Sequence, residues 1–275
     1  MNPIKALIFT GYGLNCDYET QYGLNLAGAE PHRVHINRII YDNAIQLEDY
    51  HILVFGGGFS WGDDHGAGVV MAAKIKRRLG DQLVRFVESG KLILGICNGF
   101  QCLVNLGLLP ALNNRYDERC VALTYNDTGN FIDTWVTLKI NAESPCVFTR
   151  GIHSIDLPVR HGEGKFIAAE SDLSKLFRQN QVVLQYAGTD ENQADGHCYP
   201  WNPNGSLGDI AGICDPTGRI FGLMPHPEAY NHFTNHPAWT RDKEALLREQ
   251  KTLETEEGKG IQFFRNAVNY LRENF

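Results

Sequence analysis

The stretch Leu92-Ile93-Leu94-Gly95-Ile96-Cys97-Asn98-Gly99-Phe100-Gln101 decides the fold, because a short apolar strand runs through Gly-x-Cys-x-Gly into a helix-like segment. Flanking glycines permit a tight, strained turn that holds a nucleophile above the edge of a sheet. The side chain at the tip is a thiol. At a helix N-terminus, unpaired N–H groups favour the negatively charged thiolate, which is the reactive form. Cys97 is therefore predicted to be a nucleophile.

The segments before this stretch alternate between strand and helix patterns. Lys5 to Thr10 and His51 to Phe55 have the pattern of buried strands, and Asp17 to Ala27 has that of a helix. A further amphipathic helix ends at Gly90 and has apolar residues three and four apart, at Ala72, Ile75, Leu79, Leu83 and Phe86. This order predicts a doubly wound, mostly parallel sheet with helices on both faces.

The second half of the chain changes period. Apolar residues alternate between Arg115 and Ile140, which predicts antiparallel strands added to the same sheet. A short helix is expected at 172–178, strands at 182–186 and 218–224, and a loop at 251–260. The last residues, about 260–275, have a helical period and are predicted to pack back as a closing helix. Residues 1–275 are interpreted as a single domain.

The composition excludes several classes of protein. The chain has 275 residues, 43% of them hydrophobic, and a net charge of -7. Nucleic acids and anionic membranes require clustered Lys and Arg, so neither is expected as a partner. No apolar run approaches the roughly 20 residues that span a bilayer, and the first residues lead directly into a strand, so a cytoplasmic protein is expected. Seven cysteines without a C-x-x-C pair fit neither a disulfide framework nor a zinc ribbon; all but Cys97 are interpreted as packing residues or bystanders.

A cysteine nucleophile needs a base and a group that orients the base. Met224-Pro225-His226-Pro227-Glu228 follows an apolar strand, and each proline restrains the residue before it to an extended conformation. Two residues apart, His226 and Glu228 can then face the same way, as base and orienting carboxylate. An isolated His-Pro-Glu would be interpreted as a surface turn, but its occurrence with the cysteine elbow favours the catalytic interpretation. The acid follows the histidine, unlike the order of α/β-hydrolases.

The same chemistry needs donors for the oxyanion. One candidate is the backbone N–H of Asn98, directly after the nucleophile. The other is expected from Gly56-Gly57-Gly58, which follows a strand; Gly58 is the first choice and Gly57 the second. The alternative for the glycines is a flexible strand-to-helix turn.

Several motifs follow one another along the chain. They are GLNCD (13–17), GGGFSWGD (56–63), GICNGFQ (95–101), RHGEGKF (160–166), NPNGS with IAG (202–206, 210–212) and MPHPE (224–228). In this order they resemble the triad class I glutamine amidotransferases, and among these the glutaminase subunits of phosphoribosylformylglycinamidine synthase. The resemblance implies a flavodoxin-like fold. It also implies that Cys97 attacks L-glutamine, that His226 protonates the departing ammonia, and that Gln101 positions the substrate.

The resemblance further implies partners in purine biosynthesis. The ammonia would serve a separate synthetase subunit, with a small accessory subunit as a further component, which converts formylglycinamide ribonucleotide to formylglycinamidine ribonucleotide with ATP and Mg²⁺. No G-x-x-x-x-G-K-[ST] loop occurs in this chain, so no cofactor is expected here. Gly56 stands where many relatives have proline, Ala229 where arginine is common, and residues 112–130 and 230–260 look longer than in a minimal member. These departures leave the triad intact.

Other interpretations carry less weight. Gly11-Tyr12-Gly13 with Glu30 resembles a dinucleotide fingerprint without its third glycine, so a loop beside the glutamine site is preferred. His232 and His236 could form half of a metal site, yet Pro237 and the absence of an obvious third ligand favour a solvated surface, and no metal is expected. Aromatic residues such as Tyr18 and Tyr22 are interpreted as packing residues, except Trp61, which is expected near the pocket. The alternative functions are a glutaminase for another amidotransferase, a stand-alone cysteine hydrolase or peptidase, and a catalytically idle binding subunit.

Overall fold

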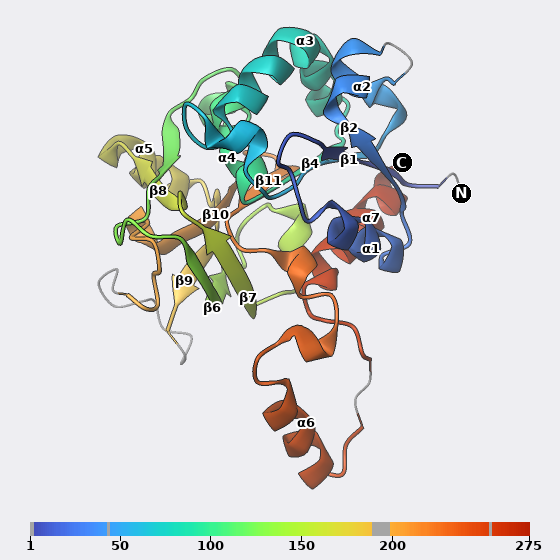
Figure 1. Cartoon of the computed structure of the whole chain (residues 1–275), viewed down its shortest axis with the longest axis vertical. Coiled ribbons are helices and arrows are strands. Elements are labelled where there is room, and N and C mark those ends of the chain that lie inside the picture. Colours follow the sequence, from blue (N-terminus) through green and yellow to red (C-terminus); the bar gives the residue numbers. More distant parts are fainter. Residues whose placement is uncertain (1–2, 43–44, 189–198, 253–254) are drawn as a thin grey trace.

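A twisted nine-stranded sheet forms the centre of the computed structural model, which describes residues 3–42, 45–188, 199–252 and 255–275 (Figure 1). Its strand order is β2-β1-β3-β4-β11-β10-β9-β6-β7. The first five strands in that order are parallel. They are β2 (Glu30–His35), β1 (Lys5–Thr10), β3 (Ile52–Phe55), β4 (Leu92–Ile96) and β11 (Ile220–Leu223). The predicted parallel, doubly wound core is confirmed.

The other half of the sheet is antiparallel. It consists of β10 (Ile210–Cys214), β9 (Val182–Ala187), β6 (Ile132–Ile140) and β7 (Ser154–His161), each antiparallel to its neighbour. The predicted addition of antiparallel strands is therefore right for β6. It is wrong for β5 (Val121–Thr124), which pairs with β8 (Lys165–Ala168) in a separate two-stranded sheet. The alternating pattern could not distinguish these outcomes, because both strands have one buried face.

Helices cover both faces of the sheet. In Figure 1, α3 (Val69–Glu88) and α4 (Asn98–Leu106) lie on one side of the central strands, and α1 (Asp17–Leu26) and α7 (Ile261–Asn274) lie together on the other. The remaining helices are α2 (Ile36–Tyr41), α5 (Glu170–Arg178) and α6 (Trp239–Arg248). The closing helix is confirmed as α7, whereas α6 lies on an extension that projects from the body (Figure 1). Among the residues that the structure describes, no helix is long and apolar enough to span a membrane.

One strand was not predicted, and one expectation about aromatic residues is wrong. Strand β2 was not predicted, because its sequence Glu-Pro-His-Arg-Val-His is polar and shows no apolar pattern; the strand lies at the edge of the sheet. Tyr18 and Tyr22 do not pack in the core, because 68% and 50% of their surfaces are exposed. Instead, the Arg33 guanidinium lies 3.3 Å from the centre of the Tyr18 ring. The positive charge of Arg33 is attracted to the face of the exposed Tyr18 ring.

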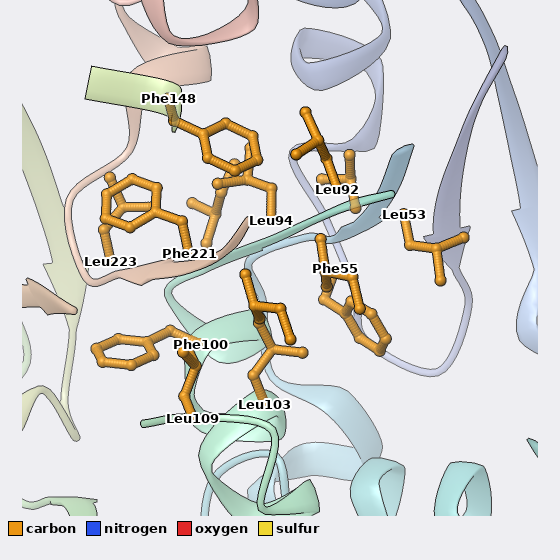
Figure 2. Close-up of a cluster of buried hydrophobic side chains, with 14 of the residues drawn as sticks. Leu53, Phe55, Leu92, Leu94, Phe100, Leu103, Leu109, Phe148, Phe221 and Leu223 are labelled. Atoms are coloured by element: carbon orange, nitrogen blue, oxygen red, sulfur yellow. The ribbon is translucent and has the colours of Figure 1, made fainter. Parts of the chain in front are cut away.

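The nucleophile segment is anchored in the core of the sheet. All five residues of β4 are buried, as expected for a central parallel strand covered on both faces. Leu92 and Leu94 point to one face of the strand, where Phe148 and Phe221 lie, and Phe100 and Leu103 of α4 fill the other (Figure 2). The position of Cys97 is thereby fixed by packing on both sides of the strand that precedes it.

We expect Gly99→Ala to lower the free energy of unfolding by about 3 kcal/mol or more. A Cβ at this position would lie 1.8 Å from the carbonyl oxygen of Phe55, a backbone atom on the neighbouring strand β3 that cannot move without distorting the sheet. Urea unfolding followed by circular dichroism measures the change. The matched control is Gly80→Ala in α3, where a Cβ would meet no atom within 4 Å. That variant should gain about 0.5–1 kcal/mol; equal stability of the two variants would contradict the predicted clash.

Candidate active site

Cys97 occupies a strained turn between β4 and α4. Its φ of 51° and ψ of -107° lie in a region that residues other than glycine rarely adopt. The turn is tight because Gly95 and Gly99 approach each other: a Cβ on Gly95 would lie 2.9 Å from the Gly99 backbone. The thiol is 4% exposed and donates to the Arg160 carbonyl oxygen at 3.6 Å. The predicted elbow is present, and strain of this kind is characteristic of functional sites.

His226 and Glu228 form a buried pair at the end of β11, the strand beside β4. The His226 Nδ1 atom lies 2.6 Å from Glu228 Oε1, and the two residues are 2% and 0% exposed. The backbone N–H of His226 donates to the Pro158 carbonyl oxygen at 2.9 Å, and this hydrogen bond fixes the backbone of the turn. Within the described part of the chain, His226 Nε2 is buried and has no hydrogen-bond partner. One ring nitrogen is thus held by a carboxylate, and the other is free to exchange a proton.

The charge balance of this pair favours a protonated imidazole. Burial by itself lowers the pKa of His226, but the Glu228 carboxylate and the thiols of Cys97 and Cys16 outweigh burial and raise that pKa well above its usual value. An imidazolium beside a thiolate is the form that a cysteine nucleophile needs.

The structure brings the cysteine and the histidine together on either side of Gly57. A Cβ on Gly57 would lie 2.8 Å from His226 Cε1 and 3.6 Å from Cys97 Cβ. Gly58, by contrast, packs against the preceding loop, where a Cβ would lie 2.4 Å from the Gly13 carbonyl oxygen. The φ of Gly58 is 126°, a conformation that needs glycine. The oxyanion roles of Gly57, Gly58 and Asn98 remain predictions, and Gly57 is the glycine that lies between Cys97 and His226.

The Asn98 side chain begins a hydrogen-bond network that joins three segments beside the nucleophile. Its Oδ1 accepts from the Ser60 N–H at 3.2 Å, and its Nδ2 donates to Asp63 Oδ1 at 2.8 Å and to Gln101 Oε1 at 3.1 Å. Gln101 Nε2 in turn donates to the Glu163 carbonyl oxygen. Asp63 and Glu163 were not predicted as site residues, although they lie within GGGFSWGD and RHGEGKF. Their place within those motifs was the only available signal.

The RHGEGKF and NPNGS motifs meet in a buried hydrogen-bond network that also includes Asn126 and Tyr186. His161 Nδ1 lies 3.0 Å from Asn126 Oδ1, and Asn204 Nδ2 donates to the Gly164 carbonyl oxygen at 2.9 Å and to the Tyr186 hydroxyl at 3.1 Å. Burial, together with the nearby His226, lowers the pKa of His161 to about 3, so this histidine is neutral. These two motifs therefore supply a rigid polar support, and His226 remains the ionisable histidine of the site.

The first loop also reaches the site. The Asn15 N–H donates to the Gly57 carbonyl oxygen at 2.9 Å, and Leu14 bridges to Gly58. This places the loop beside Gly57 and Gly58 at the candidate site, in agreement with the interpretation that was preferred over a dinucleotide site. Trp61 stacks on Tyr12 at 4.5 Å between ring centres. Cys16 was expected to be a packing residue or bystander; the tertiary structure places its thiol near both His226 and Glu228.

His232 and His236, the two histidines considered as half of a metal site, lie away from Cys97, on the extension that carries α6. His232 accepts from the Thr234 N–H, and His236 Nε2 lies 3.3 Å from Asp156 Oδ2. In the described residues the two histidines form no group with the spacing of metal ligands. A cleft of about 930 Å³ beside α6 is lined by residues such as Tyr230, Phe233 and His236, and by none of the predicted catalytic side chains.

Comparison with known proteins identifies the family. The CobB/CobQ-like glutamine amidotransferase domain matches residues 3–271, and the chain belongs to this family. It is 45% identical to the phosphoribosylformylglycinamidine synthase subunit PurQ of Methanococcus maripaludis, over 98% of both chains. It is 44% identical to the PurQ subunit of Dehalococcoides mccartyi, over 99% of this chain and 100% of that one. The structure of PurLQS from Thermotoga maritima matches 98% of this chain with 30% identity and a TM-score of 0.70, and covers 100% of the matched chain.

We expect Asp63→Asn to gain stability relative to wild type, by about 1 kcal/mol, between about pH 4.5 and pH 7.5. Burial, reinforced by the charge of Glu163, raises the pKa of Asp63 from 3.8 to about 6 against the opposing hydrogen bond from Asn98. Between these two values the folded protein keeps a proton that the unfolded chain has lost. Wild type therefore loses stability as the pH rises through this window, and above the folded pKa the penalty stays constant.

Urea unfolding of wild type and of Asp63→Asn, each at the lower and at the higher pH, measures how the stability difference between the two proteins changes with pH. The matched control is Asp64→Asn, which removes the same charge one residue away from a side chain that is 76% exposed. A stability difference between Asp63→Asn and wild type that does not change with pH would contradict the assigned carboxylate environment.

Proposed function

We propose that this chain is the glutaminase subunit of a phosphoribosylformylglycinamidine synthase, in which Cys97, His226 and Glu228 hydrolyse L-glutamine. The observation that carries the proposal is the geometry of the site: a buried thiol on a strained elbow lies across Gly57 from an imidazole, and the Nδ1 atom of that imidazole is held at 2.6 Å by a buried carboxylate. The family and the PurQ relatives support the same activity over nearly the whole chain.

The proposed reaction has two steps. The Cys97 sulfur attacks the side-chain amide carbon of glutamine, and His226 holds the thiol proton and delivers it to the nitrogen as the C–N bond breaks. Ammonia leaves, and a γ-glutamyl thioester remains on Cys97. Water then attacks the thioester, giving a proton to His226; as the C–S bond breaks, this proton returns to sulfur and glutamate is released.

The surrounding groups would hold the intermediates of this reaction. Glu228 keeps the imidazole in the tautomer that can serve the sulfur, and it stabilises the imidazolium. Backbone N–H groups of Asn98 and of the Gly57–Gly58 segment are proposed to bind the oxyanion. We propose that Gln101, in the network beside the nucleophile, orients glutamine.

The ammonia needs a partner. Because ammonia is largely protonated in neutral water, it must be delivered before it equilibrates. The matched structure from Thermotoga maritima is of PurLQS, and this chain is proposed to act in such an assembly with a synthetase subunit and a small accessory subunit. ATP and Mg²⁺ would be used by the synthetase. The proposed location is the cytoplasm, where purine synthesis would take place.

The test is to trap the thioester in the assembled complex. After rapid mixing with glutamine, acid quenching and mass spectrometry, Cys97 should carry a γ-glutamyl group and the other cysteines should not. A Cys97→Ser complex serves as the control. Glutamate formation without acylation of Cys97 would contradict the mechanism, and faster cleavage of esters or peptides than of glutamine would favour a stand-alone hydrolase.

A further inference from the structure

Backbone N–H groups without a hydrogen-bond partner lie beside the nucleophile. Among the residues that the structure describes, the N–H groups of Gly57 and Gly58 donate to no acceptor, whereas those of Phe59 and Ser60 do. The Asn98 N–H belongs to the first turn of α4, where a helix offers no acceptor of its own. Such donors can bind an oxyanion, but they come from two segments that are far apart in the sequence. The hole therefore needs a contact that holds the two segments together.

The Asn98 side chain provides this contact. It is fully buried, and its Oδ1 accepts from the Ser60 N–H at 3.2 Å. Its Nδ2 donates to Asp63 Oδ1 at 2.8 Å and to Gln101 Oε1 at 3.1 Å. The oxygen faces a donor and the nitrogen faces two acceptors, so only one orientation of the amide satisfies all three partners.

Two of these hydrogen bonds hold the ends of one strained turn, which runs from Ser60 to Asp63. Trp61, Gly62 and Asp63 have φ values of 54°, 69° and 54°. This left-handed conformation is unfavourable for Trp and Asp, and surrounding contacts must maintain it. Because both ends of the turn bind the Asn98 amide, that amide fixes the chain directly after the glycine segment.

Asp63 is itself held in place. Its carboxylate is stabilised by the backbone N–H of Gly68 as well as by Asn98. Gly68 packs closely on α4, because a Cβ at this position would lie 2.7 Å from the Cys102 backbone nitrogen. Asp63 thus links the strained turn to the helix that begins at the nucleophile.

We propose that the Asn98 side chain, oriented by Asp63, is the positioning group that holds the Gly57 and Gly58 N–H groups beside Cys97 for oxyanion binding. The inference rests on the proposed function and adds two positioning side chains to it. Both act through the backbone donors and not on the substrate. Negative charge develops on the amide oxygen only in the transition state, so their loss should lower kcat for glutamine and change KM little.

The first test compares side-chain deletions in the assembled complex. We expect Asn98→Ala and Asp63→Ala each to lower kcat at least about tenfold, with KM changed less than about threefold. Asp64→Ala is the matched control, since it removes the same group one residue away from a side chain that is 76% exposed, and it should behave as wild type. Ammonium-dependent synthesis by the same complexes should stay constant and shows that assembly is intact.

An aldehyde analogue of glutamine tests the oxyanion contact itself. The Cys97 sulfur adds to the aldehyde carbon as the π bond of the carbonyl opens, and the thiol proton passes to the oxygen. The resulting hemithioacetal places its oxygen where the oxyanion would lie. Its inhibition constant should rise at least about tenfold in Asn98→Ala and Asp63→Ala, in parallel with the loss of kcat. A purely structural role would lower stability without this parallel.

Asp63→Asn is the rescue variant, because its side-chain oxygen can still accept from Asn98 Nδ2. It should have at least about threefold higher kcat than Asp63→Ala. Equal losses in the two variants would refute the action of Asp63 through this hydrogen bond. If Asn98→Ala does not assemble, the variants at positions 63 and 64 decide alone.

The outcomes separate this inference from the proposed function. Unchanged kcat and unchanged aldehyde inhibition in Asp63→Ala would overturn the inference, while an active wild type would leave the proposed function in place. A wild-type complex without glutaminase activity would contradict the proposed function and the inference together.

Discussion

Cys97→Ala is expected to lower the glutamine-dependent activity of the assembled complex by at least about 10⁴-fold, while ammonium-dependent synthesis continues. The variant removes the only atom that can form the γ-glutamyl thioester in the proposed reaction. It leaves the strained backbone and the buried pair of His226 and Glu228 in place, because alanine is smaller than cysteine and fits the same space. The loss should therefore appear in kcat for glutamine, with little change in the synthetase.

Both activities are measured on the same purified complex, with either glutamine or an ammonium salt as nitrogen donor. Cys120→Ala is the matched control, since this half-buried cysteine lies outside the site and its loss should leave both activities unchanged. Loss of the ammonium-dependent activity in Cys97→Ala would show that the variant damages the assembly. Retention of glutamine-dependent activity would remove Cys97 from the mechanism.

Glu228→Gln is expected to lower kcat for glutamine by about 10³–10⁴-fold, the second largest effect. The carboxylate accepts the His226 Nδ1 proton at 2.6 Å and raises the pKa of the imidazole against the opposing effect of burial. A neutral amide cannot stabilise the imidazolium, and its N–H group can donate to Nδ1 and select the wrong tautomer. The pKa of His226 should therefore fall in the variant, which a histidine NMR titration measures directly.

The pair of His226 and Glu228 also makes the free energy of unfolding depend on pH. Because the folded pKa of His226 is raised, its stabilising contribution is fully present below the ordinary histidine pKa and is lost as the pH rises through the folded value. The stability gap between wild type and Glu228→Gln should thus narrow at alkaline pH. Glu228→Asp, which keeps the charge, should retain more activity than Glu228→Gln. Equal losses in the two variants would indicate that packing, and not charge, is the role of this residue.

The local parts of the site were predictable from the sequence. The elbow at Cys97 is a consequence of Gly95 near the end of a buried strand and Gly99 at the start of a helix, so its geometry depends mostly on neighbouring residues. The pairing of His226 with Glu228 is equally local, because they are two residues apart around a proline. The alternation of strands and helices likewise predicted the parallel half of the sheet and the closing helix.

Contacts between distant segments were not predictable in the same way. The pattern of β5 fitted the main sheet, but its partner is β8 in a separate sheet. Asp63 and Glu163 join the Asn98 and Gln101 network from two other loops, and their own neighbours in the sequence do not reveal this. Such pairings depend on which strand ends the tertiary fold brings side by side.

The sequence by itself determined the chemistry of this protein: a nucleophilic thiol on a turn, a histidine with its carboxylate, and the βαβ order that carries them. These features depend on covalent geometry and on residues that are close to each other in the sequence. Only the tertiary structure decided that Cys97 and His226 meet across Gly57, and that Cys16 approaches the same imidazole. The physical reason is that the parallel strands β1, β3, β4 and β11 bring their carboxyl ends to one edge of the sheet, and strand order is set by long-range packing.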